Sequence, residues 1–230
     1  LALHEFYRMS LPKQRHLEGS FSVTAGVLCC VGLAYASSAP FLLLSIVLPC
    51  FFIFLLYLFR FQDMQAVSRD LAVSLFGLLY IPLLLSHAVL LRTLPAGRDW
   101  IFLVLFVVMA SDTLAYFVGR KWGRHRLYEA VSPKKTIEGS LGGLVGSVLG
   151  ATICKLWFFT ELSSIDVFLL GVGVGAFSQL GDLVESLLKR SFGVKDSGAL
   201  VPGHGGLLDR LDSLLFAFPV TYYYAVWVFA

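Results

Sequence analysis

Acidic side chains stand inside, or at the ends of, long apolar runs of this sequence. Asp112 lies well within one run, and Asp182 and Glu185 lie near the end of another. Asp209 and Asp212 lead into a third. Ionisable groups are costly to place in lipid, so such residues are candidates for function. Ordinary charge at helix ends is the alternative, and it is weakest for Asp112, which apolar turns flank on both sides.

The spacing of these carboxylates predicts a site for a hard cation. Residues three positions apart share one face of a helix, which pairs Asp182 with Glu185 and Asp209 with Asp212. Mg²⁺ takes oxygen ligands, commonly one or two carboxylates, and completes its shell with water and substrate phosphates. No His or Cys side chain is placed to make a softer site. The carboxylates therefore predict a magnesium site that uses phosphate as a co-ligand.

The segment between the two acidic pairs is rich in glycine and in positive charge. Its glycines, which let the backbone approach a ligand closely and form anion-binding turns, are Gly198, Gly203, Gly205 and Gly206. The basic side chains in and around it are Lys189, Arg190, Lys195 and Arg210. This composition favours the binding of phosphate groups.

A second basic loop, residues 120–136, ends in Ser132-Pro133-Lys134-Lys135-Thr136. Thr136 or a neighbour is expected to cap the following helix, whose N-terminus attracts anions. Either basic loop alone is equally well explained by the enrichment of Lys and Arg on the cytoplasmic side, with lipid headgroup contact. Both loops together with intramembrane carboxylates favour a phosphate-handling site.

The elements that must position these residues are membrane spans. Of the 230 residues, 57% are hydrophobic and only 14% are charged, against about 25% charged in soluble domains. A span needs about 20 apolar residues. The sequence predicts an all-α, polytopic integral membrane protein with seven transmembrane helices, at about 20–37, 40–59, 70–91, 100–119, 137–159, 165–188 and 212–229.

The basic residues support this span count and give an orientation. With seven spans, fifteen Lys and Arg residues fall on one side and only Arg92 and Arg98 on the other, while Lys155 lies within a span. Lys and Arg favour cytoplasmic loops. The two basic loops are therefore expected in the cytoplasm.

Glycines recur at helical spacing in the fifth predicted span. Gly139 and Gly143 form one pair, and Gly142, Gly146 and Gly150 form a longer series. Small residues four apart let membrane helices approach closely. We assign these glycines to helix packing and not to chemistry.

Several stretches of the C-terminal half carry a resemblance to a known family. They are Ser186-Leu187-Leu188-Lys189-Arg190, Lys195-Asp196-Ser197-Gly198, Pro202-Gly203-His204-Gly205-Gly206 and Asp209-Arg210-Leu211-Asp212. Their order, spacing and residue types resemble the signature of the phosphatidate cytidylyltransferases, also called CDP-diacylglycerol synthases. Residues 112–119 and 132–139 resemble the same family.

The resemblance extends from about residue 110 to the end, within what is expected to be one catalytic domain over residues 1–230. Before that point the chain is similar only in being hydrophobic, apart from Glu5-Phe6-Tyr7-Arg8-Met9. The sequence opens on Leu1 and not on Met, and family members usually carry further spans there. An upstream hydrophobic segment is therefore expected.

The resemblance implies a reaction of CTP with phosphatidate that gives CDP-diacylglycerol and pyrophosphate and requires Mg²⁺. It leaves open a second, monovalent cation. It also implies a homodimer among membrane lipids, with no nucleic acid partner, in the bacterial inner membrane with the active site facing the cytoplasm. In the family, the aspartates that match Asp182 and Asp209 bind metal.

Roles follow for the remaining candidates. Further metal ligands, or supports of the ligands, are Asp112, Glu185 and Asp212. The catalytic set, most of which neutralises phosphate, is Lys189, Arg190, Lys195, Asp196, His204 and Arg210. Substrate contacts are expected from Ser132, Lys134, Lys135, Gly203, Gly205 and Gly206.

Two other classes of function stay open at this point. A transporter also places carboxylates in its spans and uses broken, glycine-rich helices. It has no need of a loop rich in glycine, lysine and aspartate on one face only. The other possibility is a related membrane enzyme that uses CTP on another lipid. Composition does not separate such an enzyme from a phosphatidate cytidylyltransferase.

Overall fold

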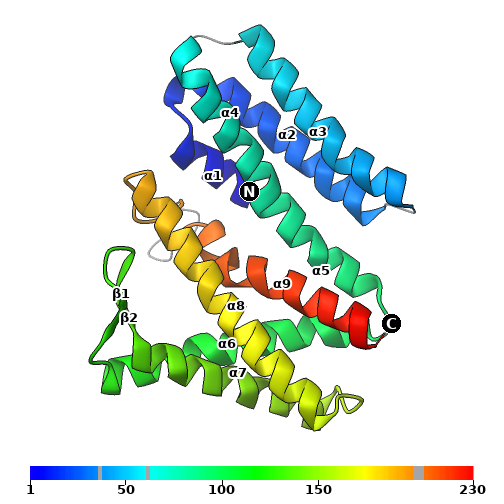
Figure 1. Ribbon diagram of the computed structural model, residues 1–230, viewed down its shortest axis with the longest axis vertical. Helices are drawn as coiled ribbons and strands as arrows, with labels where there is room; N and C mark the ends of the chain where they lie inside the picture. The colour runs from blue at the N-terminus through cyan, green and yellow to red at the C-terminus, as the bar shows by residue number, and fades with distance from the viewer. Residues whose placement is uncertain (36–37, 61–62, 199–204, 230) are drawn as a thin grey trace. The chain divides into compact units, whose positions relative to one another are not determined.

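A computed structural model describes residues 1–35, 38–60, 63–198 and 205–229. The described chain is almost entirely helical, with one two-stranded hairpin (Figure 1). The elements are α1 (Ala2–Ser10), η1 (Lys13–Arg15), α2 (His16–Ala34), α3 (Ala39–Arg60), α4 (Met64–Leu78), η2 (Leu79–Leu83), α5 (Leu84–Thr93), α6 (Gly97–Trp122), β1 (Arg126–Tyr128), β2 (Ser132–Thr136), α7 (Ile137–Trp157), α8 (Ser164–Ser191) and α9 (Leu208–Val228).

Seven helical stretches among the described residues are long and apolar enough to cross a membrane. They are Lys13–Ala34, Ala39–Arg60, Met64–Thr93, Gly97–Trp122, Ile137–Trp157, Ser164–Ser191 and Leu208–Val228. The predicted all-α polytopic membrane protein is confirmed, and each predicted span is present. The helices extend beyond the apolar runs because polar residues start some of them: the Asp63 side chain accepts a hydrogen bond of 2.9 Å from the backbone N–H of Gln65 at the start of α4.

The third span changes its helical form in the middle. Between α4 and α5 the five residues of η2 form a π-helix that contains Pro82. Proline has no backbone N–H and crowds the preceding turn, so it disturbs the hydrogen-bond pattern of a regular α-helix. A wider turn accommodates the proline within one continuous helical span.

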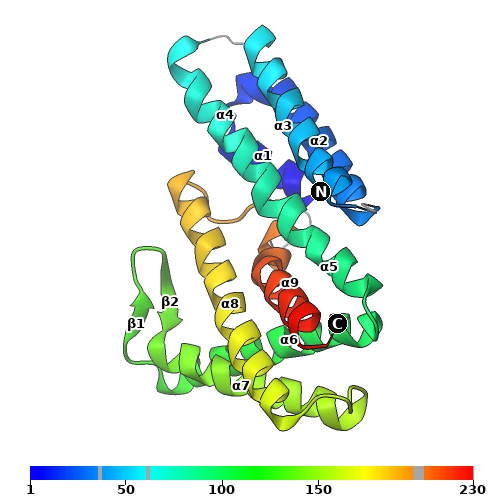
Figure 2. The ribbon, with the colours of Figure 1, turned by 45° about the vertical axis from the view of Figure 1, so that its right-hand side comes forward.

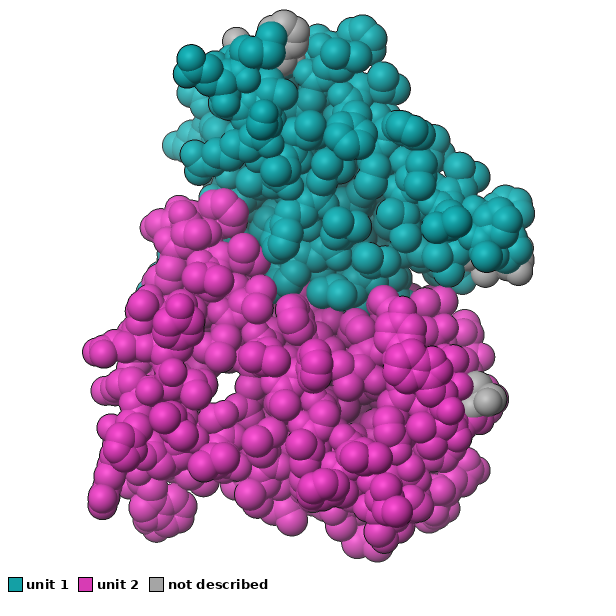
Figure 3. Space-filling model, in the orientation of Figure 1, with its two compact units in different colours: residues 1–86, 194–211 teal, residues 87–193, 212–230 magenta. Residues whose placement is uncertain are grey.

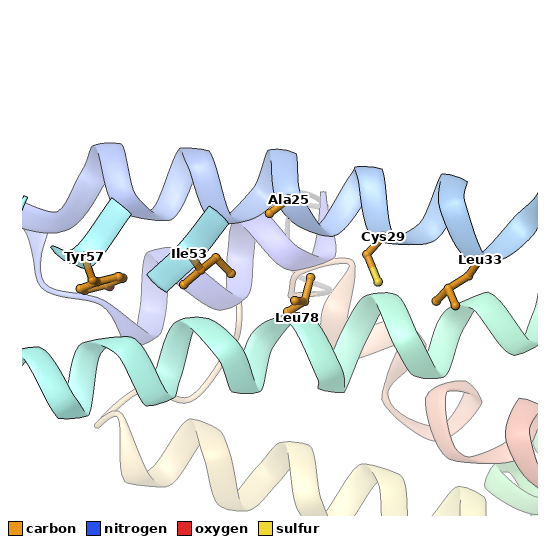
Figure 4. Close-up of a cluster of buried hydrophobic side chains, with 6 residues drawn as sticks. All are labelled: Ala25, Cys29, Leu33, Ile53, Tyr57 and Leu78. Carbon is orange, nitrogen blue, oxygen red and sulfur yellow. The ribbon is translucent and has the colours of Figure 1, made fainter. Parts of the chain in front are cut away.

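The chain forms two compact units, shown in different colours in Figure 3. The first consists of Leu1–Ser86 and Val194–Leu211. Its core includes a cluster of buried side chains from α2, α3 and α4 (Figure 4): Ala25, Cys29, Leu33, Ile53, Tyr57 and Leu78. These apolar positions stay buried while the opposite faces of α2 and α3 are exposed, as expected for helices that face lipid.

The second unit consists of His87–Gly193 and Asp212–Ala230. Here α6 packs on α7, and α7 packs on α8 (Figure 2). A methyl group at Gly146 would lie 2.5 Å from the carbonyl oxygen of Ala110, and one at Gly139 would lie 2.9 Å from the carbonyl oxygen of Ala115. Only glycine permits these approaches, so the predicted role of the glycines in helix packing is confirmed.

The β1–β2 hairpin connects α6 to α7 and was not predicted. Its strands pair antiparallel, with Arg126 opposite Thr136 and Tyr128 opposite Ser132. The sequence of β2 contains a proline and two lysines and has no alternation of apolar residues, so it lacks the usual signal of a strand. Thr136 caps α7 as predicted, because its hydroxyl oxygen accepts a hydrogen bond of 3.1 Å from the N–H of Gly139.

Candidate active site

A cavity of about 540 Å³ lies in the second unit, where α6, the hairpin, α7 and α8 meet. Its wall contains Asp112, Lys134, Lys135 and Asp182, four residues that the sequence analysis selected. Pockets for small molecules and cofactors span about 300–1,000 Å³. This cavity is therefore large enough for a nucleotide, and it presents charges of both signs.

An ion pair joins the hairpin to α8 across this cavity. The Nζ atom of Lys135 lies 2.5 Å from Oδ2 of Asp182, and both side chains are partly buried. Lys135 comes from β2, directly before the cap of α7, whereas Asp182 lies in the last third of α8. Because the pair is only partly screened by water, it fixes both side chains at the cavity wall.

Three carboxylates from three helices act on one another electrostatically. Asp112 of α6 interacts with Asp182, and Asp212 of α9 interacts with both of them. α8 and α9 are in close contact here, since a methyl group at Gly181 would lie 2.5 Å from the carbonyl oxygen of Asp212. Lys135 and Lys189 partly offset the accumulated negative charge.

This donor set fits a magnesium ion by its chemistry, because it offers carboxylate oxygens and a surplus of negative charge. Within the described residues, no three acidic, His or Cys side chains are grouped closely enough to form a complete metal cage. Mg²⁺ does not need one, since it often uses one or two carboxylates and fills its shell with water and phosphate oxygens. Asp182 with Asp112 or Asp212 is the combination available in this unit.

Glu185 lies one turn after Asp182 on α8 and is fully buried. Its carboxylate forms an ion pair with Lys189, one turn further along the same helix. The structure thus joins a predicted metal ligand to a predicted phosphate-binding lysine. A buried carboxylate paired in this way orients the lysine, and its role as a metal ligand stays a prediction.

The cavity also contains side chains that the sequence analysis did not select. Arg120 and Arg126 add two positive charges to its wall, and Nη1 of Arg120 donates a hydrogen bond of 2.9 Å to the hydroxyl of Tyr116. Both arginines belong to the basic 120–136 loop, but nothing in their spacing distinguished them from their neighbours. Arg120 reaches the cavity from the last turn of α6 and Arg126 from strand β1.

Gln179 and Ser140 form a polar link between α8 and α7 in the wall of the cavity. The Gln179 Nε2 donates to the carbonyl oxygen of Ser140 at 3.1 Å, and the Ser140 hydroxyl donates to the Gln179 Oε1. Two mutual hydrogen bonds fix the side-chain amide. No local pattern indicated this pair, because 39 positions separate the two residues.

The hairpin is held by contacts at both of its ends. Glu138 accepts hydrogen bonds from the backbone N–H of Arg124, at 3.1 Å, and of His125, at 3.2 Å. Nε of Arg190 lies 3.5 Å from the carbonyl oxygen of Val131. Ser132 pairs with Tyr128 in the hairpin and does not line the cavity, so its contact with substrate stays a prediction.

The glycine-rich segment belongs to the first unit, where Asp209 organises it. Oδ2 of Asp209 accepts hydrogen bonds from the backbone N–H of Gly206 at 2.7 Å and from the hydroxyl of Ser197 at 2.9 Å. Gly205 has a φ of +78°, and a methyl group there would lie 2.6 Å from the Asp209 carboxylate. In this structure, Asp209 therefore shapes the loop by holding its two ends together.

Glu5 of α1 holds the same segment from the other side and was missed as a site residue. Its carboxylate accepts hydrogen bonds from the backbone N–H of Leu207, at 3.0 Å, and of Leu208, at 2.9 Å. These groups lie at the N-terminus of α9, where backbone N–H groups lack helical partners and a negative charge is favourable. The only signal was the short match that begins at Glu5.

For some predicted site residues, the contact with substrate stays a prediction. Lys195, Asp196 and Arg210 are exposed on the first unit. Gly203 and His204 lie outside the described residues. Asp182 and Asp209 belong to different compact units, so their joint binding of a metal stays a prediction.

The fold and the site define a polytopic helical membrane protein whose cavity combines carboxylates with lysine and arginine side chains. A comparison with protein-family models gives its family. Residues 1–228 match the model of the cytidylyltransferase family, so this chain belongs to that family. The predicted family and enzyme class, a nucleotidyltransferase, are confirmed.

Curated relatives agree with this assignment. A phosphatidate cytidylyltransferase of Bacillus subtilis is 42% identical over 146 residues, which is 63% of this chain and 54% of that relative. One from Staphylococcus haemolyticus is 35% identical over 96% of this chain and 84% of its own length. One from Synechocystis is 41% identical over 72% of this chain and 66% of its own length.

Proposed function

We propose that this chain transfers the cytidylyl group of CTP to phosphatidate, which forms CDP-diacylglycerol and releases pyrophosphate. The observation that carries the proposal is a cavity with Asp182 and Lys135 on its wall in a chain of the cytidylyltransferase family. The relatives that bear the name phosphatidate cytidylyltransferase support phosphatidate as the acceptor.

The chemistry requires little proton transfer. The second pKa of a phosphate monoester is about 6, so the phosphatidate oxygen is already anionic near neutral pH. That oxygen forms a bond to the α-phosphorus of CTP while the bond to the pyrophosphate oxygen breaks. The main obstacle is repulsion between two anionic substrates, and positioned positive charges lower it.

The basic residues of the cavity suit this task. Lys134, Lys135, Arg120 and Arg126 all line it and are available to neutralise and align the phosphates of CTP. Lys135 is fixed by Asp182, and Lys189 by Glu185. Such fixed charges need little reorganisation when negative charge shifts to the leaving pyrophosphate.

A magnesium ion is part of the proposal. Asp182 would hold it together with Asp112 or Asp212, and Asp209 is the further ligand that the family resemblance implies. When bound, the ion would act as a Lewis acid that neutralises phosphate oxygens. A second, monovalent cation remains an expectation from the resemblance alone.

We place the active site at the cytoplasmic face of a bacterial inner membrane and propose that the protein works as a homodimer. The excess of Lys and Arg on one side of the seven spans supports this orientation. Labelling of single cysteines at Glu129 and Glu161 in intact cells tests it. Only the Glu161→Cys variant is expected to react with an impermeant reagent added outside, and reaction of only the Glu129→Cys variant would contradict the orientation.

The function is tested with purified full-length protein that contains this chain. CTP, phosphatidate and Mg²⁺ are expected to give CDP-diacylglycerol and pyrophosphate in equal amounts. Absence of product from a folded sample would contradict the proposal. Product formed only when phosphatidate is replaced by another phosphorylated lipid would identify a related enzyme, and solute flux into vesicles without CTP would indicate a transporter.

A further inference from the structure

The first unit contains a second cavity, of about 580 Å³, between α1, η1 and the start of α2. Its charged lining residues within the described chain are all basic: Arg8, Lys13 and Arg15, with His4 and His16 beside them. None of these residues belongs to the site proposed for nucleotidyl transfer. A cavity with this lining attracts anions.

The inner wall of this cavity is fixed by buried contacts. Arg15 is 3% exposed, and its Nε donates to Asp70 at 3.0 Å while its Nη1 donates to the carbonyl oxygen of Arg60 at 3.1 Å. The third nitrogen, Nη2, has no hydrogen-bond partner among the described residues. Arg15 therefore combines a fixed position with an unused donor.

Tyr7 completes the rigid side of the cavity. Its hydroxyl donates a hydrogen bond of 2.6 Å to the carbonyl oxygen of Ser74, which ties α1 to α4. Burial raises the pKa of this hydroxyl well above its usual range, so it remains a neutral donor. The wall is thus preformed and does not depend on ligand for its order.

The outer rim differs from the wall because its charges are exposed and uncompensated. Arg15 is paired with Asp70 and Glu18. Arg8 and Lys13, by contrast, are exposed and have no carboxylate partner among the described residues. The cavity therefore keeps at least two net positive charges that a ligand is free to neutralise.

The location of the cavity favours a lipid over a soluble anion. Among the described residues, the candidate membrane span nearest the N-terminus begins at Lys13, so the basic rim lies at the start of a span. Leu17 and Phe21, one turn apart on α2, are exposed and are sequence neighbours of His16 and Ser20, which line the cavity. A headgroup at the rim would leave acyl chains to lie along this apolar face.

From this arrangement we infer that the α1–α2 cavity binds the phosphate group of an anionic glycerophospholipid, with Arg8 and Lys13 as its principal contacts. Arg15 and Tyr7 form the fixed wall against which the headgroup rests. The inference does not depend on the proposed reaction. It gives the enzyme a lipid-binding site built from residues outside the nucleotide cavity.

The test uses native mass spectrometry of the full-length protein with phosphatidylglycerol and with phosphatidylcholine of the same acyl chains. The wild type is expected to retain phosphatidylglycerol preferentially. Each basic residue near an anionic membrane surface contributes about 1 kcal/mol, or about fivefold in affinity. The double variant Arg8→Gln/Lys13→Gln should therefore bind phosphatidylglycerol about 30-fold more weakly, while Arg8→Lys/Lys13→Arg should retain binding.

The matched control is Arg69→Gln/Lys121→Gln, which removes the same charge from exposed positions on the same predicted side of the membrane. It is expected to bind lipid as the wild type does. Equal loss in both double variants would contradict the inference, because it would show attraction to overall charge alone. Binding of inorganic phosphate at the cavity with no preference for anionic lipid would also overturn it.

Discussion

Lys135 and Asp182 form an ion pair of 2.5 Å that joins the β1–β2 hairpin to helix α8. The two residues are 47 positions apart in the sequence, yet each was selected from its own local pattern. Their contact places the basic end of the 120–136 loop beside the intramembrane carboxylates. The nucleotide site proposed above is built around this pair.

The first prediction concerns the charge of Lys135. Lys135→Gln removes a positive charge from the cavity and leaves Asp182 without its partner. Hydrogen bonds to charged groups contribute about 1.5–3 kcal/mol, so kcat/KM for CTP should fall about 10- to 100-fold. Steady-state kinetics at varied CTP concentration measures the effect. Lys121→Gln, at an exposed position outside the cavity, should leave the kinetics unchanged, and an equal loss there would contradict the assignment.

The second prediction concerns Glu5 as a residue that positions the glycine-rich segment. Glu5→Ala leaves the N–H groups of Leu207 and Leu208 without their acceptor. Leaving buried groups unsatisfied costs about 1–3 kcal/mol each, so the thermal unfolding temperature should fall. The kcat should also fall, and it should change by a larger factor than the KM for CTP. Glu5→Gln keeps one acceptor oxygen, so its unfolding temperature and its kcat should lie between those of the wild type and those of Glu5→Ala.

The control for Glu5 is Glu161→Gln, which removes the same charge from an exposed residue. It should match the wild type in both measurements. If Glu5→Ala lost stability but kept kcat, Glu5 would be a structural cap of α9 with no influence on turnover.

The third prediction compares two glycines with similar backbone conformations. Gly205 has a φ of +78° and Gly193 a φ of +72°, but a methyl group would meet Asp209 only at Gly205. Both alanine variants carry the strain of a left-handed residue, about 1–2 kcal/mol. Gly205→Ala should also displace Asp209 and lower activity well below that of Gly193→Ala. Equal activities in a turnover assay would exclude a role for the Asp209 contact.

The fold was largely predictable from the sequence because hydropathy reports membrane spans directly. All seven predicted spans are present, although their ends moved where polar residues such as Asp63 start a helix. The hairpin was not predictable, since β2 contains Pro133 and two lysines in five residues. The π-helical segment at Pro82 was equally hidden, because periodicity does not reveal how a span accommodates a proline.

The site was predictable only as far as local patterns extend. Asp112, Lys134, Lys135 and Asp182 were selected by residue type, and the structure brings them to one cavity. Glu5 was not predicted as a site residue because its hydrogen-bond partners lie about 200 positions away. Arg120 and Arg126 were not predicted because no local pattern distinguished them from the other basic residues of the 120–136 loop. Contacts between distant segments depend on packing, which spacing along a chain does not encode.

The most direct test of the central claim measures CDP-diacylglycerol formation by Asp182→Asn as a function of Mg²⁺ concentration. The substitution keeps the size of the side chain but removes the charge that would hold the metal and that fixes Lys135. The account predicts a loss of kcat of at least about 100-fold. Size-exclusion chromatography should show that the variant is still folded. The same experiment applies to Asp209→Asn. Near-normal turnover of Asp182→Asn with unchanged Mg²⁺ dependence would contradict the assignment of this cavity as the active site.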